Sequence, residues 1–143
     1  MIRAFNNQYK WLSNFSPVAL RVNGLSFPTL EHAYQAYRAT NEEDREKIRT
    51  ALTPGQAKRI AHSVEQDPKF PARRVEIMTK LLEAKFRKPK LKAKLKATGK
   101  QELVEGNNWH DNFYGNCLCR PCATITGHNM LGKLLMKIRD EVE

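Results

Sequence analysis

The chain has 143 residues, a length that suits one domain with a single hydrophobic core and room for a cleft. Hydrophobic residues make up 41% and charged residues 28%, which excludes a disordered chain, and no window reaches the ~20 consecutive apolar residues of a membrane-spanning helix. The net charge of +10 favours anionic partners such as phosphates, nucleotides or nucleic acid. Residues 1–10 are polar and lack a signal-peptide core. We therefore predict a cytoplasmic protein, with no membrane partner, that forms one domain over residues 1–143.

Local patterns predict the elements in chain order. Residues 18–27 alternate around Asn23-Gly24, a signal for a β-hairpin, and Thr29 and Thr53 are expected N-caps. Residues 106–127 are expected to form a long polar loop. The predicted fold class is α+β, a mostly helical single domain with a small β-sheet. Apolar spacing places helices at 30–39, 41–52, 54–64, 72–87, 90–97 and 129–142, short strands at 101–105 and 112–115, and a break at Pro71.

A basic segment, residues 85–100, supplies most of the excess positive charge. It contains one aromatic residue, Phe86, so the sequence shows no stacking platform for single-stranded nucleic acid. Two interpretations stay open: a solvated helix face that promotes solubility, or a patch that follows a phosphate backbone. The cations are Lys85, Arg87, Lys88, Lys90, Lys92, Lys94, Lys96 and Lys100, with no acid among them.

The first predicted helix carries a polar stripe. Glu31, Gln35 and Arg38 lie at i, i+4 and i+7, so one face of the helix presents all three. A carboxylate near a helix start, with a cation two turns on, suits a general base and a phosphate clamp. The alternative is an ordinary helix face with weak charge pairing.

The segment 105–111 gathers a second set of candidate residues. Hydrolysis of an N-glycoside needs a carboxylate to activate water or to stabilise an oxocarbenium-like centre, and a surface that holds the leaving base. Glu105 and Asp111 are the candidate carboxylates, and Trp109 and Tyr114 are candidates to stack on the base. The alternative is a polar turn with Trp109 in the core.

Three cysteines, Cys117, Cys119 and Cys122, lie within six residues of one another. An odd local cluster does not indicate a disulfide framework, so the thiols are expected to be reduced. His110 or His128 could complete a zinc site. However, the sequence lacks the usual zinc motif, in which two closely spaced pairs of ligands are far apart from each other in the chain. We assign no metal and no cofactor to the chain, and the cysteines are alternatively small loop residues.

The start of the last predicted helix allows two interpretations. Asn129 is a candidate N-cap beside free N–H groups that could receive a phosphate. Alternatively, Gly132 only permits close helix packing.

Four segments together resemble the NADAR (YbiA-like) domain family. They are residues 12–17 (LSNFSP), 27–36 (FPTLEHAYQA), 103–106 (LVEG) and 129–139 (NMLGKLLMKIR), and their order and spacing match across nearly the whole chain. The resemblance implies a YbiA-like fold and an N-glycosidase linked to NAD and ADP-ribose metabolism. It implies a substrate that is either ADP-ribosylated guanine in nucleic acid or a phosphoribosylaminopyrimidine.

The resemblance also implies site residues. Glu31, Glu105 and Asp111 match acidic positions and are the predicted catalytic residues. The predicted substrate-binding residues are Asn14, Phe15, His32, Gln35, Arg38, Trp109, Tyr114 and Asn129.

One departure from the family affects the mechanism. Relatives usually carry lysine where this chain has Arg38, and a lysine amine can attack a sugar C1′, whereas arginine stays protonated. The favoured function is therefore an N-glycosidase that uses carboxylate-activated water on an ADP-ribose-like or phosphoribosyl substrate. Two alternatives remain: a non-catalytic ADP-ribose or nucleotide-binding module, and a zinc-stapled nucleic-acid-binding protein.

Overall fold

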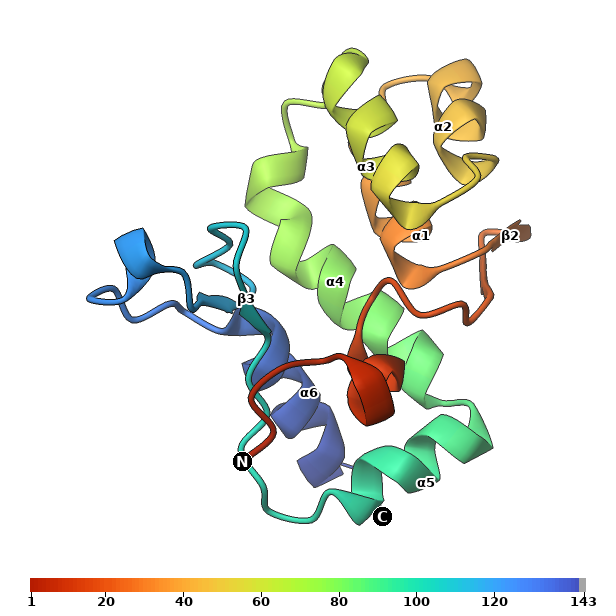
Figure 1. Cartoon of the computed structure of the whole chain (residues 1–143). Coiled ribbons are helices and arrows are strands. Elements are labelled where there is room, and N and C mark those ends of the chain that lie inside the picture. The colour runs from red at the N-terminus through yellow and green to blue at the C-terminus, as the bar shows by residue number, and fades with distance from the viewer. Residues whose placement is uncertain (142–143) are drawn as a thin grey trace. The chain divides into compact units, whose positions relative to one another are not determined.

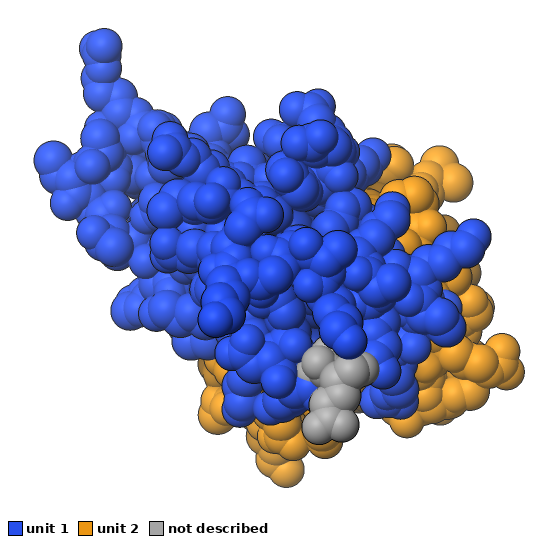
Figure 2. Space-filling model, turned by 90° about the horizontal axis from the view of Figure 1, so that it is seen from below, with its two compact units in different colours: residues 1–13, 86–143 blue, residues 14–85 orange. Residues whose placement is uncertain are grey.

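The computed structural model describes residues 1–141 (Figure 1). The chain forms two compact units, which Figure 2 distinguishes by colour. Unit 2 is continuous and spans residues 14–85, whereas unit 1 combines residues 1–13 with the residues from 86 onward. Unit 2 is therefore an insertion in the sequence of unit 1.

Unit 2 begins with the predicted hairpin. Strand β1 (Leu20–Val22) pairs antiparallel with β2 (Leu25–Phe27), and Leu20 lies opposite Phe27. Asn23 and Gly24 both have positive φ, 50° and 81°. Two consecutive residues in this region form the tight turn that Asn-Gly favours, so the hairpin prediction is confirmed.

Three short helices follow, and each begins at a polar N-cap. Helices α1 (Leu30–Ala36), α2 (Glu42–Arg49) and α3 (Pro54–Ser63) are capped by Thr29, Asn41 and Thr53. Each cap side chain accepts a hydrogen bond from the N–H three residues further on, which satisfies an otherwise unpaired donor. Asn41 thus precedes α2 and is not part of it.

Helix α1 is shorter than predicted, and the predicted end at residue 39 is wrong. After Ala36 the backbone pairs with a distant segment: the Arg38 carbonyl accepts from Asp67 N at 2.7 Å, and Ala39 forms a bridge with Gln66. These long-range hydrogen bonds replace the ones that would continue the helix.

Helix α4 (Phe70–Phe86) begins two residues before the predicted start. The expected break at Pro71 is wrong, because proline in the first turn of a helix lacks only an N–H that has no partner there. Met78, Leu82 and Phe86 are buried along one stripe of the helix, as their spacing predicts.

Unit 1 contains the remaining helices. Helix α5 (Pro89–Ala97) starts at its proline and stops before Gly99, whose φ of 64° is typical of a helix end. Helix α6 (Met130–Glu141) follows the long loop. Val142, predicted on its apolar face, lies outside the described residues.

The predicted strands at 101–105 and 112–115 are wrong. Leu103 forms only an isolated bridge with Ile2, and the short parallel pair is β3 (Gly106–Asn107) with β4 (Asn116–Cys117). Residues 111–114 form a turn instead, because the Asp111 carboxylate accepts hydrogen bonds from the backbone of that turn. The α+β class is confirmed, with helices predominating. Within residues 1–141, no helix combines the length and apolarity needed to cross a membrane.

Candidate active site

The predicted stripe on α1 is a row of hydrogen-bonded side chains. Gln35 Nε2 donates to Glu31 Oε1 at 3.3 Å, and Arg38 Nε donates to Gln35 Oε1 at 2.8 Å. Glu31 and Gln35 are 7% and 2% exposed, so the row lies largely out of water. Helix α1 carries the first two residues, and Arg38 joins them from the turn that follows.

The surroundings of Arg38 fix its guanidinium group. Its Cζ lies 4.5 Å from the centroid of the Phe70 ring, and Phe70 contacts Tyr34 edge to face at 5.4 Å. A cation over an aromatic face is attracted by the ring quadrupole. Arg38 is thus positioned to bind an anion and to orient Gln35.

His32 is buried, and both its ring nitrogens are engaged. Nε2 donates to the Ala51 carbonyl at 2.9 Å, so in the neutral ring Nδ1 accepts from the Thr29 hydroxyl at 2.8 Å. These bonds tie the start of α1 to the chain after α2. They give His32 a positioning function, and its predicted contact with substrate stays a prediction.

Asn14 and Phe15 belong to the loop that precedes the hairpin. The Asn14 carbonyl accepts from Glu31 N at 3.1 Å, and its Nδ2 donates to Met78 Sδ at 3.4 Å. Its Oδ1 is buried and has no hydrogen-bond partner within residues 1–141. A buried acceptor without a partner costs free energy, so it suits a donor supplied by a ligand. Phe15 is exposed.

Lys85 is a further candidate site residue, and its place at the start of the basic segment conceals it in the sequence. Its side chain is 1% exposed, and Nζ donates to Ser16 Oγ at 3.1 Å. Burial lowers the pKa of Lys85 to about 7. The signal was available, since Lys85 continues the buried stripe of Met78, Leu81 and Leu82 on α4.

The second group of predicted residues lies in unit 1, around Asn107. The Asn107 amide donates to Glu105 Oε2 at 3.1 Å and to the Asp111 carbonyl at 2.8 Å. Asp111 Oδ1 accepts from the backbone N–H groups of Phe113 and Tyr114 at 3.1 and 3.0 Å. Asn107 thus links the Glu105 carboxylate to the backbone of Asp111, whereas the Asp111 carboxylate is engaged by its own turn.

The two predicted stacking residues differ in exposure. Trp109 is 57% exposed, so the alternative that it lies in the core is wrong. Tyr114 is half-buried and packs edge to face on Phe113 at 4.8 Å. Trp109 is therefore the more accessible aromatic surface of this segment.

Asn129 connects the start of α6 to the segment before β3. Its Oδ1 accepts from Glu105 N at 2.9 Å, and its Nδ2 donates to the Leu103 carbonyl at 2.8 Å. A Cβ on Gly132 would overlap that same carbonyl, so the packing interpretation of Gly132 is confirmed.

The proposed phosphate position at this helix start is wrong. The carbonyls of Phe113, Tyr114 and Gly115 accept the N–H groups of residues 130, 131 and 129 at 2.9–3.1 Å. These donors are already satisfied. The predicted role of Asn129 toward substrate stays a prediction.

The predicted residues therefore form two groups, one in each unit. Unit 2 holds Asn14, Phe15, Glu31, His32, Gln35 and Arg38, and unit 1 holds Glu105, Trp109, Asp111, Tyr114 and Asn129.

Together these features define a class of protein. A buried carboxylate, an amide and arginine that orient it, and a buried lysine of lowered pKa are typical of acid–base catalysis in an enzyme. Known proteins agree with this conclusion. The NADAR domain family matches residues 2–143.

Individual relatives extend the match. N-glycosidase YbiA of Escherichia coli is 32% identical, over 96% of this chain and 84% of the relative. A riboflavin biosynthesis protein of Vibrio vulnificus is 31% identical, over 96% of this chain and 37% of its own length. The solved structure of Escherichia coli YbiA superimposes with a TM-score of 0.82 at 31% identity, covering 98% of this chain and 82% of that one.

The chain belongs to the NADAR domain family and is an enzyme of the N-glycosidase class. Its fold is the YbiA-like fold that the sequence resemblance implied.

Proposed function

We propose that the enzyme hydrolyses the N-glycosidic bond of an ADP-ribose-type or phosphoribosyl substrate, and that it removes ADP-ribose from guanine in nucleic acid. The observation that carries this proposal is the hydrogen-bonded row of buried Glu31, buried Gln35 and half-buried Arg38, in the same unit as the buried Lys85.

The reaction defines what the side chains must do. The C1′–N bond breaks, positive charge develops on the sugar, the leaving base gains a proton, and water adds to C1′ and loses a proton. Glu31 is suited to stabilise the developing charge and to accept the proton of the water. Gln35 holds one oxygen of that carboxylate, and Arg38 binds a phosphate of the substrate.

Lys85 supplies the amine that Arg38 cannot. A pKa of about 7 leaves Lys85 partly protonated at neutral pH, the condition under which a group can donate a proton to a leaving base. The neutral fraction could instead attack C1′ as a nucleophile. Trapping with borohydride distinguishes these roles, since only the nucleophile forms a reducible imine.

The basic segment supports a nucleic-acid substrate over a small metabolite. Seven of its eight cations are exposed, all of them in unit 1, and Lys85 alone is buried. Trp11 adds an aromatic ring beside this segment, and its centroid lies 5.9 Å from Lys94 Nζ. A phosphoribosylaminopyrimidine is the next candidate, in keeping with the name of the Vibrio vulnificus relative.

Product analysis by mass spectrometry tests the proposal. The enzyme is incubated with a guanine-ADP-ribosylated oligonucleotide and, separately, with a phosphoribosylaminopyrimidine. We expect release of ADP-ribose from the oligonucleotide, and a loss of roughly 10²-fold or more in rate for Glu31→Gln. The matched control is Glu76→Gln, an exposed carboxylate of unit 2 that pairs with Lys80.

The outcome also tests the binding-module alternative, which rests on Arg38. Suppose that wild type binds the substrate and leaves it intact, and that only Arg38→Lys turns it over. This result would establish a binding module and overturn the proposal. Release of free base from the aminopyrimidine alone would replace the nucleic-acid substrate by the metabolite.

A further inference from the structure

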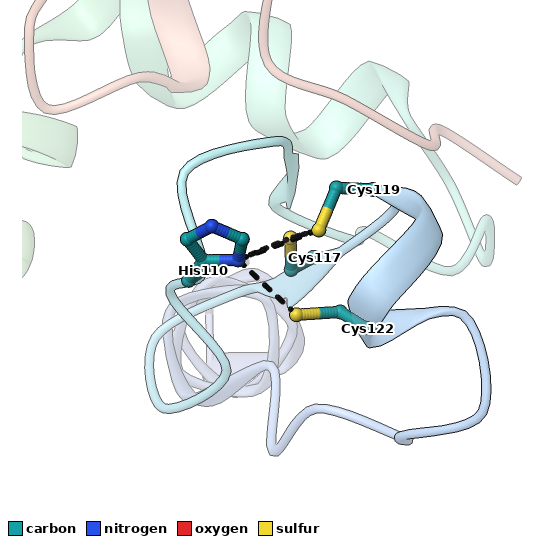
Figure 3. A group of neighbouring side chains, drawn as sticks. All are labelled: His110, Cys117, Cys119 and Cys122. Carbon is teal, nitrogen blue, oxygen red and sulfur yellow. Dashed lines mark hydrogen bonds between the residues drawn. The ribbon is translucent and has the colours of Figure 1, made fainter.

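The loop between β3 and α6 gathers one histidine and all three cysteines of the chain (Figure 3). The ligand atoms of His110, Cys117, Cys119 and Cys122 all lie within 4.8 Å of one another. His110 Nδ1 lies 3.3 Å from Cys119 Sγ, 3.4 Å from Cys122 Sγ and 3.9 Å from Cys117 Sγ. The Cys117 and Cys119 sulfurs are 3.2 Å apart, and all three cysteines are free.

We propose that these four residues bind a structural zinc ion. Four atoms around a tetrahedral zinc, at about 2.3 Å for sulfur and 2.0 Å for nitrogen, are separated from one another by roughly 3.5–3.8 Å. The separations between ligand atoms given above, from 3.2 to 3.9 Å, lie on both sides of these values. Three thiolates and one imidazole are soft ligands, and four-coordinate sites of this composition are typical of zinc.

The backbone is shaped to deliver the ligands. Strand β4 provides Cys117, and the following 3₁₀ helix Arg120–Cys122 provides Cys122, whose N–H donates to the Cys119 carbonyl at 3.1 Å. His110 has a φ of 68°, a left-handed conformation that needs support from surrounding structure. Zinc coordination would provide that support.

The burial of the sulfurs favours a closed site. Cys117 and Cys122 are 2% and 7% exposed, and Cys119 is half-buried. Four protein ligands leave no open position for a substrate, so the ion holds structure and does not catalyse. A disulfide framework would leave one of the three sulfurs unpaired, whereas a single ion engages all of them.

The location explains what the ion stabilises. Within the described part of the loop, residues 108–129 contain only β4 and one 3₁₀ turn as regular structure. Metal-binding free energy becomes folding free energy in such a segment. His110 lies between Trp109 and Asp111, so the ion fixes the backbone on which both predicted site residues depend.

The structure also decides between the two candidate histidines. His128 is not in the cluster, and its ring packs at 6.1 Å from that of Phe113. His128→Gln is therefore a matched control for His110→Gln, with the same substitution in the same loop.

Metal analysis of the full-length protein, expressed with zinc and purified under reducing conditions, tests the proposal. We expect about one zinc per chain in wild type and in His128→Gln, and a loss of most of it in His110→Gln and Cys122→Ser. Less than about one zinc per four chains in wild type, after reconstitution with zinc, would overturn the proposal. Equal zinc content in His110→Gln and wild type would also overturn it.

Two further measurements need no variant that might misfold. Cobalt substituted into wild type should give the visible absorption of a tetrahedral thiolate site, and an octahedral spectrum would contradict the proposal. A strong chelator should lower the midpoint of thermal unfolding, and added zinc should restore it. An unchanged midpoint in protein shown to be free of metal would contradict a structural ion.

Discussion

Lys85 and His32 are both buried in unit 2, but their partners give them different functions. The ring of His32 is held by a hydroxyl and a carbonyl, so it positions helix α1. Lys85 donates to a serine hydroxyl, and burial lowers its pKa to about 7. The lowered pKa lets the charge of Lys85 change near neutral pH.

Substitution of Lys85 should reveal its titration in the stability of the protein. Between about pH 7 and pH 10.4 the unfolded chain binds a proton at this lysine that the folded chain lacks. The cost of burying the charge is therefore present in full below about pH 7 and disappears as the pH rises. We expect the free energy of unfolding of Lys85→Met, minus that of wild type, to fall by on the order of 4 kcal/mol between pH 6 and pH 10.5.

Urea unfolding at both pH values measures this difference. Lys80→Met, an exposed lysine on the same helix, is the control and should show no such pH dependence. A constant difference for Lys85→Met would mean that its pKa is not lowered.

Residue types and spacing predicted part of the site. The stripe of Glu31, Gln35 and Arg38 was predictable because the helix period alone places these residues together. The hydrogen bond from Lys85 to Ser16 and the unpartnered oxygen of Asn14 were not predictable, since both depend on contacts between the loop at 14–16 and helix α4.

At the level of elements, the helix starts were predictable and the ends were less so. Thr29 and Thr53 cap their helices through hydrogen bonds to residues three positions away, which the local sequence specifies. The end of α1 depends on pairing with Gln66 and Asp67, and the strands in unit 1 depend on partners across a loop. Local patterns contain neither kind of information.

The start of α6 should be intolerant of any side chain at position 132. A Cβ there would overlap the Leu103 carbonyl and the Asn129 side chain, and neither backbone can move without breaking the hydrogen bonds of Asn129. We expect Gly132→Ala to destabilise the protein by about 1–3 kcal/mol in chemical denaturation.

Gly55→Ala is the matched control for that prediction. Position 55 lies in the first turn of α3, and a Cβ there would meet only ordinary contacts at 3.8 Å or more. Alanine is the better helix former, so this variant should be neutral or more stable than wild type. Similar losses in both variants would contradict close packing at Gly132.

At the scale of the whole molecule, the charge of +10 should make nucleic-acid binding depend on salt. Replacing Lys90, Lys92, Lys94 and Lys96 by glutamine should weaken binding of single-stranded DNA. It should also reduce the slope of log affinity against log salt by about 0.7 for each phosphate that a lysine no longer neutralises. Titration at several salt concentrations measures the slope.

The control for that measurement removes lysines that already pair with acids. Lys47 and Lys80 lie 3.7 and 3.2 Å from glutamate oxygens on their own helices, so glutamine at both positions should leave the slope nearly unchanged. An equal change per lysine replaced in the two variants would indicate an effect of net charge alone, without a phosphate-binding patch.

The interrupted sequence of unit 1 imposes an order on its assembly during synthesis. Ile2 N donates to the Glu102 carbonyl, and the Ile2 carbonyl accepts from Val104 N, so residues 1–13 wait for partners that are made about 100 residues later. At ribosomal rates of about 5–20 residues per second, that delay is on the order of 5–20 s. Unit 2 has no such delay, because its chain is continuous and all of its residues have been synthesised once residue 85 is added. A nascent chain stalled soon after unit 2 leaves the ribosome should therefore present residues 1–13 unprotected to a chaperone or a protease.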